Sequence, residues 1–124
     1  MASQLKRIKR GDIVSVLFPN SDLRSSKIRP VLVVQADSLN AGLSQLIVAM
    51  VTSNLARLGH PSRVSIPKSS LQGQIAGLPV DSDVMLDNLV TIKLQSIQRW
   101  IGRLDMTEVD QALAVTSGLD WIPR

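Results

Sequence analysis

Short runs rich in β-branched residues, each ended by proline, glycine or polar residues, recur along this chain and predict strands rather than long helices. One of them, 45–52, is almost entirely apolar, which predicts a strand buried on both faces. The predicted strands cover residues 12–18, 29–36, 45–52, 63–66, 83–92 and 97–104.

A helix is expected only near the C-terminal end of the sequence. Val109, Ala112, Leu113 and Thr116 recur at helical spacing and predict a helix over 107–117, with Thr107 as its cap and a stop at Gly118. The remaining segments are polar: 20–28, 53–61 and 68–79 are predicted loops, and 37–44 a turn or one short helical turn. The fold class predicted is mainly β with a C-terminal α-helix, arranged as a small, partly closed antiparallel barrel or sandwich.

A polar pair, Asp87-Asn88, interrupts the strand predicted over 83–92 and indicates a bulge or a functional edge. The two tryptophans, Trp100 and Trp121, are expected in the core or at a dimer interface. With Phe18 they are the only aromatic residues, too few for a base-stacking platform.

Composition narrows the function classes. The chain has 124 residues, which predicts a single domain over 1–124. It has no cysteine and one histidine, which excludes disulfides, thiolate zinc sites and a multi-histidine metal site. Lys and Arg total 14 against 10 Asp and Glu, which moderately favours an anionic partner.

The N-terminal segment, 1–10, is polar and basic, and two interpretations of it stay open. It is either a flexible, solvated terminus or an arm that contacts phosphates. It has no apolar core of the kind a secretory signal needs, and no apolar run in the chain is long enough for a membrane span. The expected location is therefore the cytoplasm.

Two predicted strands, 29–36 and 45–52, have equal length and a short connection, so the simplest pairing is antiparallel and in register. This places Ala36 opposite Gln45, Val33 opposite Val48 and Arg29 opposite Thr52, with each opposed pair on one face of the sheet. The fork of an arginine matches two phosphate oxygens and a threonine hydroxyl can donate to another. This end of the sheet therefore suits metal-free phosphoryl transfer, although such a pair also serves solubility and strand pairing.

Four motifs in order give a more specific indication. Arg10-Gly11-Asp12-Ile13-Val14 opens the first predicted strand, Arg29-Pro30-Val31-Leu32-Val33 opens the second, and Val51-Thr52-Ser53-Asn54 closes the third. The segment 84–92 (VMLDNLVTI) and the trailing 101–105 (IGRLD) follow. Together they resemble the MazF/PemK toxin family over roughly residues 8–117.

The resemblance implies a small SH3-like antiparallel barrel that forms a homodimer, as the toxin of a type II toxin–antitoxin system. It implies an endoribonuclease (an mRNA interferase) that needs no cofactor and no metal and inhibits growth by cutting single-stranded RNA at short sequences. In such cleavage the 2′-hydroxyl attacks the adjacent phosphate and leaves a 2′,3′-cyclic phosphate and a 5′-hydroxyl. The implied partners are RNA and an acidic antitoxin protein, with DNA contacted only indirectly through the antitoxin.

By position, the resemblance assigns catalytic roles to Arg29 and Thr52. Asp87 matches an aspartate that some members use catalytically and others structurally, and both roles stay open. Further residues, in the loop before the second strand and after the third, are the candidates for RNA binding. They are Asn20, Arg24, Lys27, Ser53 and Asn54.

The chain also departs from the family at positions that bear on catalysis. Arg24 stands where many members have a glutamate, and Met85 where some have an arginine. His60 is the only imidazole and is expected in an exposed turn, since no spacing places it near Arg29. Two alternatives therefore stay open: a non-enzymatic CcdB-like toxin that binds DNA gyrase, against which Arg29 and Thr52 argue, and an inactive barrel that serves as an interaction module.

Overall fold

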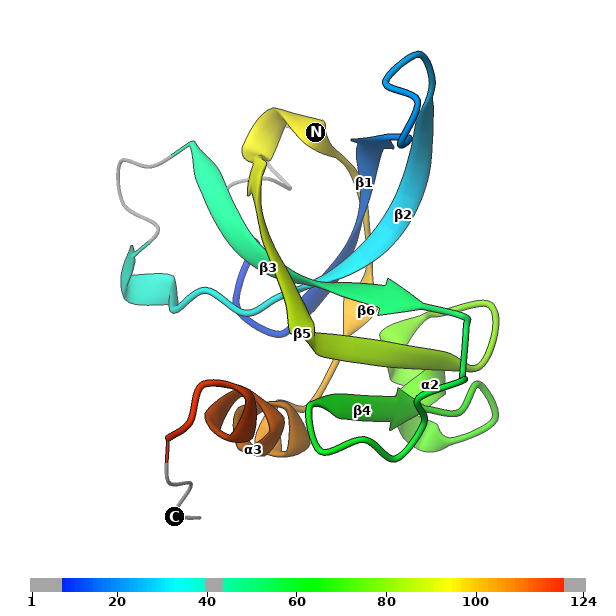
Figure 1. The fold of residues 1–124 in the computed structure, drawn as a ribbon, viewed down its shortest axis with the longest axis vertical. Coiled ribbons are helices and arrows are strands. Elements are labelled where there is room, and N and C mark those ends of the chain that lie inside the picture. The colour runs from blue at the N-terminus through cyan, green and yellow to red at the C-terminus, as the bar shows by residue number, and fades with distance from the viewer. Residues whose placement is uncertain (1–7, 40–43, 120–124) are drawn as a thin grey trace.

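The computed structural model describes residues 8–39 and 44–119. Within these ranges the chain forms six strands and two helices, with short 3₁₀ turns at Asp37–Leu39 and Leu94–Ser96 (Figure 1). The strands are β1 (Asp12–Pro19), β2 (Ser26–Val33), β3 (Gln45–Thr52), β4 (Arg63–Ile66), β5 (Ser82–Lys93) and β6 (Ile97–Arg103). The helices are α2 (Leu71–Ala76) and α3 (Thr107–Thr116).

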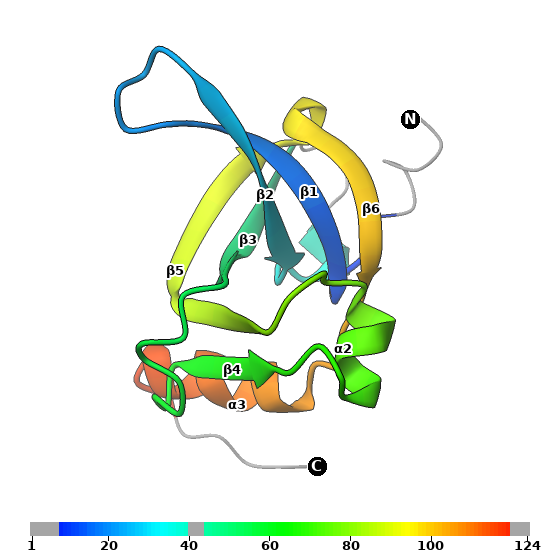
Figure 2. The ribbon, with the colours of Figure 1, turned by 90° about the vertical axis from the view of Figure 1, so that its right-hand side faces the viewer.

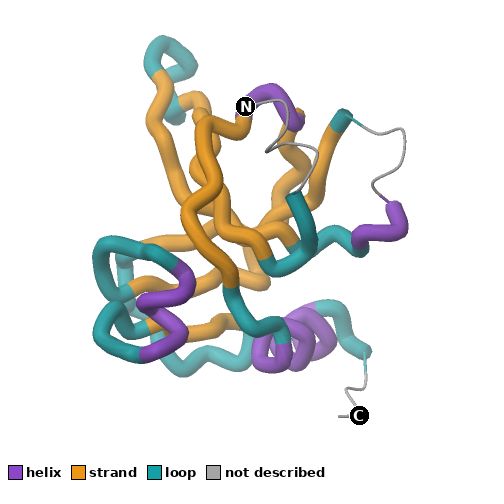
Figure 3. The backbone as a smooth tube through the Cα atoms, turned by 180° about the vertical axis from the view of Figure 1, so that it is seen from behind, coloured by secondary structure: helices purple, strands orange, loops and turns teal. Residues whose placement is uncertain are grey.

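All six strands join one curled antiparallel sheet in the order β4-β5-β3-β2-β1-β6, which confirms the predicted fold class. Helices α2 and α3 lie at the same end of the molecule, and the β1–β2 turn lies at the opposite end (Figures 2 and 3). None of the helices formed by the described residues has both the length and the apolar character that a membrane span requires.

The predicted register between the second and third strands is correct where they pair, with Val33 opposite Val48. The pairing is shorter than predicted, however, and covers only Val31–Val33 of β2. The backbone N–H groups of Val34 and Gln35 both donate to the Ile47 carbonyl, so the chain leaves the register and Ala36 does not pair with Gln45. The strand predicted over 29–36 therefore ends at residue 33, and it begins at residue 26 because its first residues pair with β1.

The core has two parts, one on each face of the sheet. Side chains alternate along a strand, so Ile13 and Leu32 join the cluster near α3, while Val14 and Val31 join the cluster inside the curl. Strand β3 contributes to both clusters but is not buried on both faces throughout, since Ile47 is partly exposed. The β-branched composition of the central strands follows from this two-sided burial.

Helix α3 occupies the predicted position, ending one residue earlier, at Thr116. Met106 rather than Thr107 is the residue that precedes the first turn, and it makes no side-chain cap.

The Arg10 guanidinium joins the N-terminal segment to helix α3: its Nη2 lies 2.6 Å from Asp110 Oδ1. Residues 8–10 are thus part of the fold rather than a flexible arm; residues 1–7 lie outside the described ranges.

Helix α2 lies within 68–79, which was wrongly predicted to be a loop. Ser70 caps it by accepting the N–H of Gly73 at 2.9 Å, and Gly77 ends it in the left-handed conformation, with a φ of 71°. The helix packs directly on β6, because a Cβ on Gly102 would lie 2.2 Å from the Ala76 carbonyl oxygen. This close approach is between backbones, and hydrophobic periodicity does not reveal it.

The predicted interruption at Asp87-Asn88 is confirmed as a bulge. Met50 of β3 pairs with Met85 while the preceding Ala49 pairs with Leu89, so residues 86–88 of β5 have no partner in β3.

Trp100 is 45% exposed on β6, which excludes it from the core of this chain. Trp121 lies outside the described residues.

Candidate active site

Arg29 and Thr52 line the same cavity, of about 460 Å³, here called the Arg29 cavity. Its walls come from the start of β2, the end of β3, the segment after α2 and the bulged part of β5. No ladder pair joins the two residues, because the pairing of β2 with β3 ends at Val31 and Met50. The two residues nevertheless lie near each other at one end of the sheet, as predicted, since both line this cavity.

The Arg29 cavity is cationic. Lys27 and Arg29 line it, and its lining contains no carboxylate and no imidazole. Arg29 is exposed and forms no ion pair or side-chain hydrogen bond with any other residue that the structure describes. Its fork of N–H donors is therefore available to an anion, and its geometry matches two oxygens of a phosphate or of a carboxylate.

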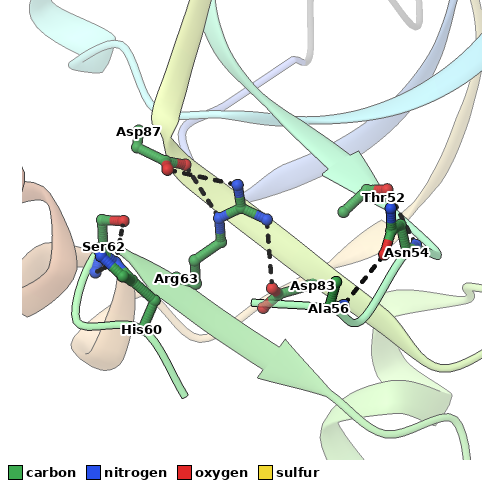
Figure 4. A network of polar contacts seen from close by, with 8 residues as sticks. All are labelled: Thr52, Asn54, Ala56, His60, Ser62, Arg63, Asp83 and Asp87. Carbon is green, nitrogen blue, oxygen red and sulfur yellow. Dashed lines mark hydrogen bonds and ion pairs between the residues drawn. The ribbon is translucent and has the colours of Figure 1, made fainter. Parts of the chain in front are cut away.

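Thr52 is oriented by a turn of the backbone that follows it. Its Oγ1 accepts the N–H of Asn54 at 3.0 Å, and Asn54 Oδ1 in turn accepts the N–H of Ala56 at 3.0 Å (Figure 4). Because Oγ1 already accepts a hydrogen bond, its own proton is left for donation to a ligand oxygen. Thr52 is half-buried, so the hydroxyl is held in place and still reaches solvent.

A second cavity, of about 250 Å³, adjoins the first and is here called the Arg57 cavity. Thr52 and Met85 line both cavities, so the Thr52 hydroxyl stands between them. The other residues that line the Arg57 cavity are Asn54, Ala56, Arg57 and Arg63. Arg57 and Arg63 thus add two cations to a cavity that Thr52 also lines, and the sequence did not predict either of them.

Asp87 lies outside the lining of both cavities and is engaged by Arg63 (Figure 4). Arg63 Nε is 3.1 Å from Asp87 Oδ1, and Nη2 is 3.3 Å from Oδ2, which is a two-pronged ion pair. Burial alone would raise the pKa of Asp87, but the hydrogen bonds and the positive charge of Arg63 outweigh it and lower that pKa below its ordinary value. This geometry suits a structural role better than that of a general base.

The same guanidinium faces a second carboxylate, that of Asp83. Arg63 Nη1 lies 3.5 Å from Asp83 Oδ2, and Asp83 is fully buried with no hydrogen bond to either carboxylate oxygen within the described part of the chain. Burial raises the pKa of Asp83, and the nearby charge of Arg63 offsets this only in part. A carboxylate inside a strand requires a cation close by, which is the signal in the sequence that could have led to Arg63.

Two predicted RNA-binding residues lie apart from the cavities. Asn20 and Arg24 are in the β1–β2 turn, where Asn20 Nδ2 donates to Ser25 Oγ at 2.8 Å and the Arg24 N–H donates to Asp22 Oδ1 at 2.9 Å. That bond from Arg24 is the main cause of the lowered pKa of Asp22. Of the other candidates, Lys27 and Ser53 line the Arg29 cavity, and Asn54 lines the Arg57 cavity.

His60 is exposed in a turn, as predicted. Its Nδ1 lies 2.7 Å from Ser62 Oγ and accepts the N–H of Ser62 at 3.1 Å. It borders a shallow groove between β4 and α3 and not the two cavities at Thr52. Nor do three His, Asp or Glu side chains gather anywhere in 8–39 and 44–119 as a set of metal ligands.

The curled sheet, with an arginine and a threonine at a cationic cavity, defines a small β protein suited to binding a polyanion. Residues 9–116 match the family described as PemK-like, MazF-like toxin of type II toxin–antitoxin system. The chain belongs to this family.

Relatives and solved structures agree with this assignment. The chain is 36% identical over 101 residues to endoribonuclease MazF6 of Mycobacterium tuberculosis, covering 78% of this chain and 84% of that protein. It is 29% identical over 117 residues to endoribonuclease MazF of Staphylococcus epidermidis, covering 91% and 93%. Among solved structures, Mycobacterium tuberculosis toxin MazF-mt6 superposes with a TM-score of 0.65 at 26% identity, covering 90% of this chain and 100% of that one.

The fold also matches a toxin that was solved together with its antitoxin. An endoribonuclease in complex with its cognate antitoxin from a mycobacterial species superposes with a TM-score of 0.70 at 20% identity, covering 93% of this chain and 99% of that one. These matches favour the MazF interpretation over a CcdB-like gyrase poison.

Proposed function

We propose that this chain is a metal-independent, sequence-specific endoribonuclease that cleaves single-stranded RNA, and that it is the toxin of its toxin–antitoxin pair. The observation that carries the proposal is the Arg29 cavity. An arginine with no partner among the described residues and an oriented threonine hydroxyl line it, together with a lysine and without any carboxylate. Its donors match the charge that develops on a phosphate during transesterification.

The proposed reaction is an internal transesterification. The ribose 2′-oxygen forms a bond to the adjacent phosphorus, the bond from phosphorus to the 5′-oxygen breaks, and the products are a 2′,3′-cyclic phosphate and a 5′-hydroxyl. The fork of Arg29 holds two non-bridging oxygens as negative charge accumulates, and the Thr52 hydroxyl donates to one of them. The proton of the 2′-hydroxyl passes to solvent, and the leaving oxygen takes a proton from solvent.

Because the lining of the cavity holds no base, rate enhancement rests on orientation and charge stabilisation, and we expect a modest rate. Lys27 and Ser53 bind RNA beside the reacting phosphate, and Asn20 and Arg24 bind nucleotides farther along the strand. Asp87 has a structural role: it holds Arg63. His60 takes no part, since it borders neither cavity.

The proposal extends to partners and location. The cationic cavities fit an acidic antitoxin segment that competes with RNA. A fold neighbour, the endoribonuclease from a mycobacterial species, was solved in complex with its cognate antitoxin. The active form is a homodimer in the cytoplasm, and contact with DNA occurs only through the antitoxin.

The test is incubation of the purified protein with a long single-stranded RNA in EDTA. The wild type is expected to give discrete fragments that end in a cyclic phosphate. Arg29→Ala is expected to lose activity by at least about 100-fold, since one donor at a developing oxyanion contributes that much. The matched control is Arg99→Ala, an exposed arginine on β6 outside both cavities, which should cut at the wild-type rate. Intact RNA with the folded wild type, or full activity of Arg29→Ala, contradicts the proposal.

A further inference from the structure

The Arg57 cavity presents mainly hydrogen-bond donors to whatever enters it. The orientation of the Asn54 amide is settled by the backbone, since the Ala56 N–H can only donate and therefore identifies the atom that it meets as Oδ1. The amide nitrogen, Nδ2, has no hydrogen-bond partner among the residues that the structure describes. Asn54, which lines the cavity, thus has two free N–H donors, while its oxygen already accepts one hydrogen bond.

The two arginines of the cavity differ in how firmly they are held. Arg63 is clamped from two sides by Asp83 and Asp87, and its side chain is only 10% exposed, so it forms a rigid wall. Arg57 is exposed and forms no ion pair with any described residue. Its guanidinium is therefore the mobile donor of the cavity.

No carboxylate lines this cavity, and its remaining walls are the Thr52 hydroxyl, the Ala56 methyl group and the Met85 side chain. A ligand that fits must bring hydrogen-bond acceptors and one flat apolar surface for Ala56 and Met85. An RNA base has this composition. Thr52 lies at the boundary between the cavity and the Arg29 cavity, so the base belongs to a nucleotide adjacent to the reacting phosphate.

Resting on the proposed ribonuclease function, we infer that the Arg57 cavity selects a keto base, guanine or uracil, next to the cleaved bond. Guanine O6 and uracil O4 are acceptors at the edge where adenine and cytosine carry an amino donor. Asn54 Nδ2 and the Arg57 guanidinium donate to such a carbonyl, and an amino group would face them with donor against donor. The cavity therefore discriminates by attraction for one pair of bases and by repulsion of the other.

The decisive variant is Asn54→Asp. It keeps Oδ1 for the Ala56 N–H, so the turn after Thr52 is retained, and it replaces the two N–H donors with an acceptor oxygen. The matched control is Gln72→Glu, which adds the same charge on the exposed surface of α2, outside the cavity. Arg57→Met is a second variant, in which an exposed side chain loses its donors and the described contacts of the fold stay intact.

The measurement is sequencing of the fragment ends from a random-sequence single-stranded RNA pool cut in EDTA. For the wild type and Gln72→Glu, guanine and uracil together are expected to exceed adenine and cytosine by at least about fivefold at one position flanking the cut. Asn54→Asp is expected to lose or reverse that preference at that position alone, and Arg57→Met to weaken it.

Other outcomes overturn the inference in ways that can be told apart. If the wild type cuts without any keto preference beside the cut, or if Asn54→Asp keeps the wild-type preference, the inference is wrong and the ribonuclease function stands. If Asn54→Asp only slows cleavage at unchanged sites, the cavity holds a phosphate and not a base. Intact RNA with the folded wild type contradicts both the function and the inference.

Discussion

Replacing Arg63 with methionine tests whether this arginine is the counter-charge of the buried Asp83. Methionine retains much of the aliphatic volume and removes the guanidinium, so Asp83 loses the cation 3.5 Å away and Asp87 loses both of its bonds to Arg63. Asp83 is fully buried and has no hydrogen bond to another described residue that could compensate. The variant therefore isolates the energetic consequence of an unpaired interior carboxylate.

The size of the effect follows from protonation. A buried carboxylate without a counter-charge takes up a proton, and neutralising a carboxyl of ordinary pKa at pH 7 costs about 4 kcal/mol. Part of this penalty is already present in the wild type, since burial raises the pKa of Asp83. We therefore expect Arg63→Met to lower the free energy of unfolding by about 2–3 kcal/mol at pH 7, with less than about 1 kcal/mol more from the partly exposed Asp87.

The assay is urea unfolding of the wild type, Arg63→Met and the double variant Arg63→Met/Asp83→Asn at pH 7 and pH 5. Between these values the loss should shrink by at most about 1.4 kcal/mol for each unit of pH, because protonation of Asp83 becomes easier. The double variant should regain much of the lost stability, since it has no interior charge. Arg57→Met is the matched control and should stay within about 0.5 kcal/mol of the wild type.

A loss below about 1 kcal/mol for Arg63→Met, or a loss that is the same at both pH values, would refute this account of the pair. So would a double variant that is less stable than Arg63→Met. Any of these three results would mean that Asp83 is stabilised by something other than the charge of Arg63.

Two further predictions concern the frame around the cavities. Gly102→Ala places a Cβ 2.2 Å from the Ala76 carbonyl oxygen and should lower the free energy of unfolding by about 1–3 kcal/mol. It should also slow RNA cleavage, since Leu78, Pro79, Val80 and Ser82, just after α2, line the Arg29 cavity. An unchanged melting temperature contradicts the predicted loss of stability. Asp87→Asn should be destabilising at neutral pH, because a lowered pKa in the folded state stabilises the protein above the ordinary carboxyl pKa, and this contribution is lost as the pH falls through the folded value. In urea titrations its difference from the wild type should close below about pH 4, and a difference that stays constant down to pH 2 rules the account out.

Much of the β architecture could be predicted because its signals are local. The β-branched runs located all six strands, and the polar pair at 87–88 located the bulge of β5. The register of Val33 with Val48 followed from equal strand lengths. Helix α2 could not be predicted in this way, since its six residues are too few to establish an apolar period and its backbone lies directly against Gly102.

The residues of the candidate site also differ in whether local sequence signals predict them. Strand register indicated that Arg29 and Thr52 belong together, and the two residues do line one cavity. The register did not indicate Arg57 and Arg63, which come from a loop and from the edge strand β4. It also left the role of Asp87 open, because an ion pair with Arg63 depends on where two side chains meet, and no local pattern encodes that.

The order and approximate extent of the strands, the cationic balance of the chain and the placement of Arg29 and Thr52 at one end of the sheet are properties of the sequence by itself. They follow from side-chain branching, charge and the two-residue period of a strand, which act over a few residues. Only the tertiary structure decided that Arg63 is clamped by Asp83 and Asp87, and that Thr52 stands between two cavities. Those features arise because β5 pairs with β4 on one side and with β3 on the other, which places Arg63 opposite Met85, between Asp83 and Asp87, and Thr52 opposite Asp83. These pairings join segments that are far apart in the sequence, so no local pattern encodes them.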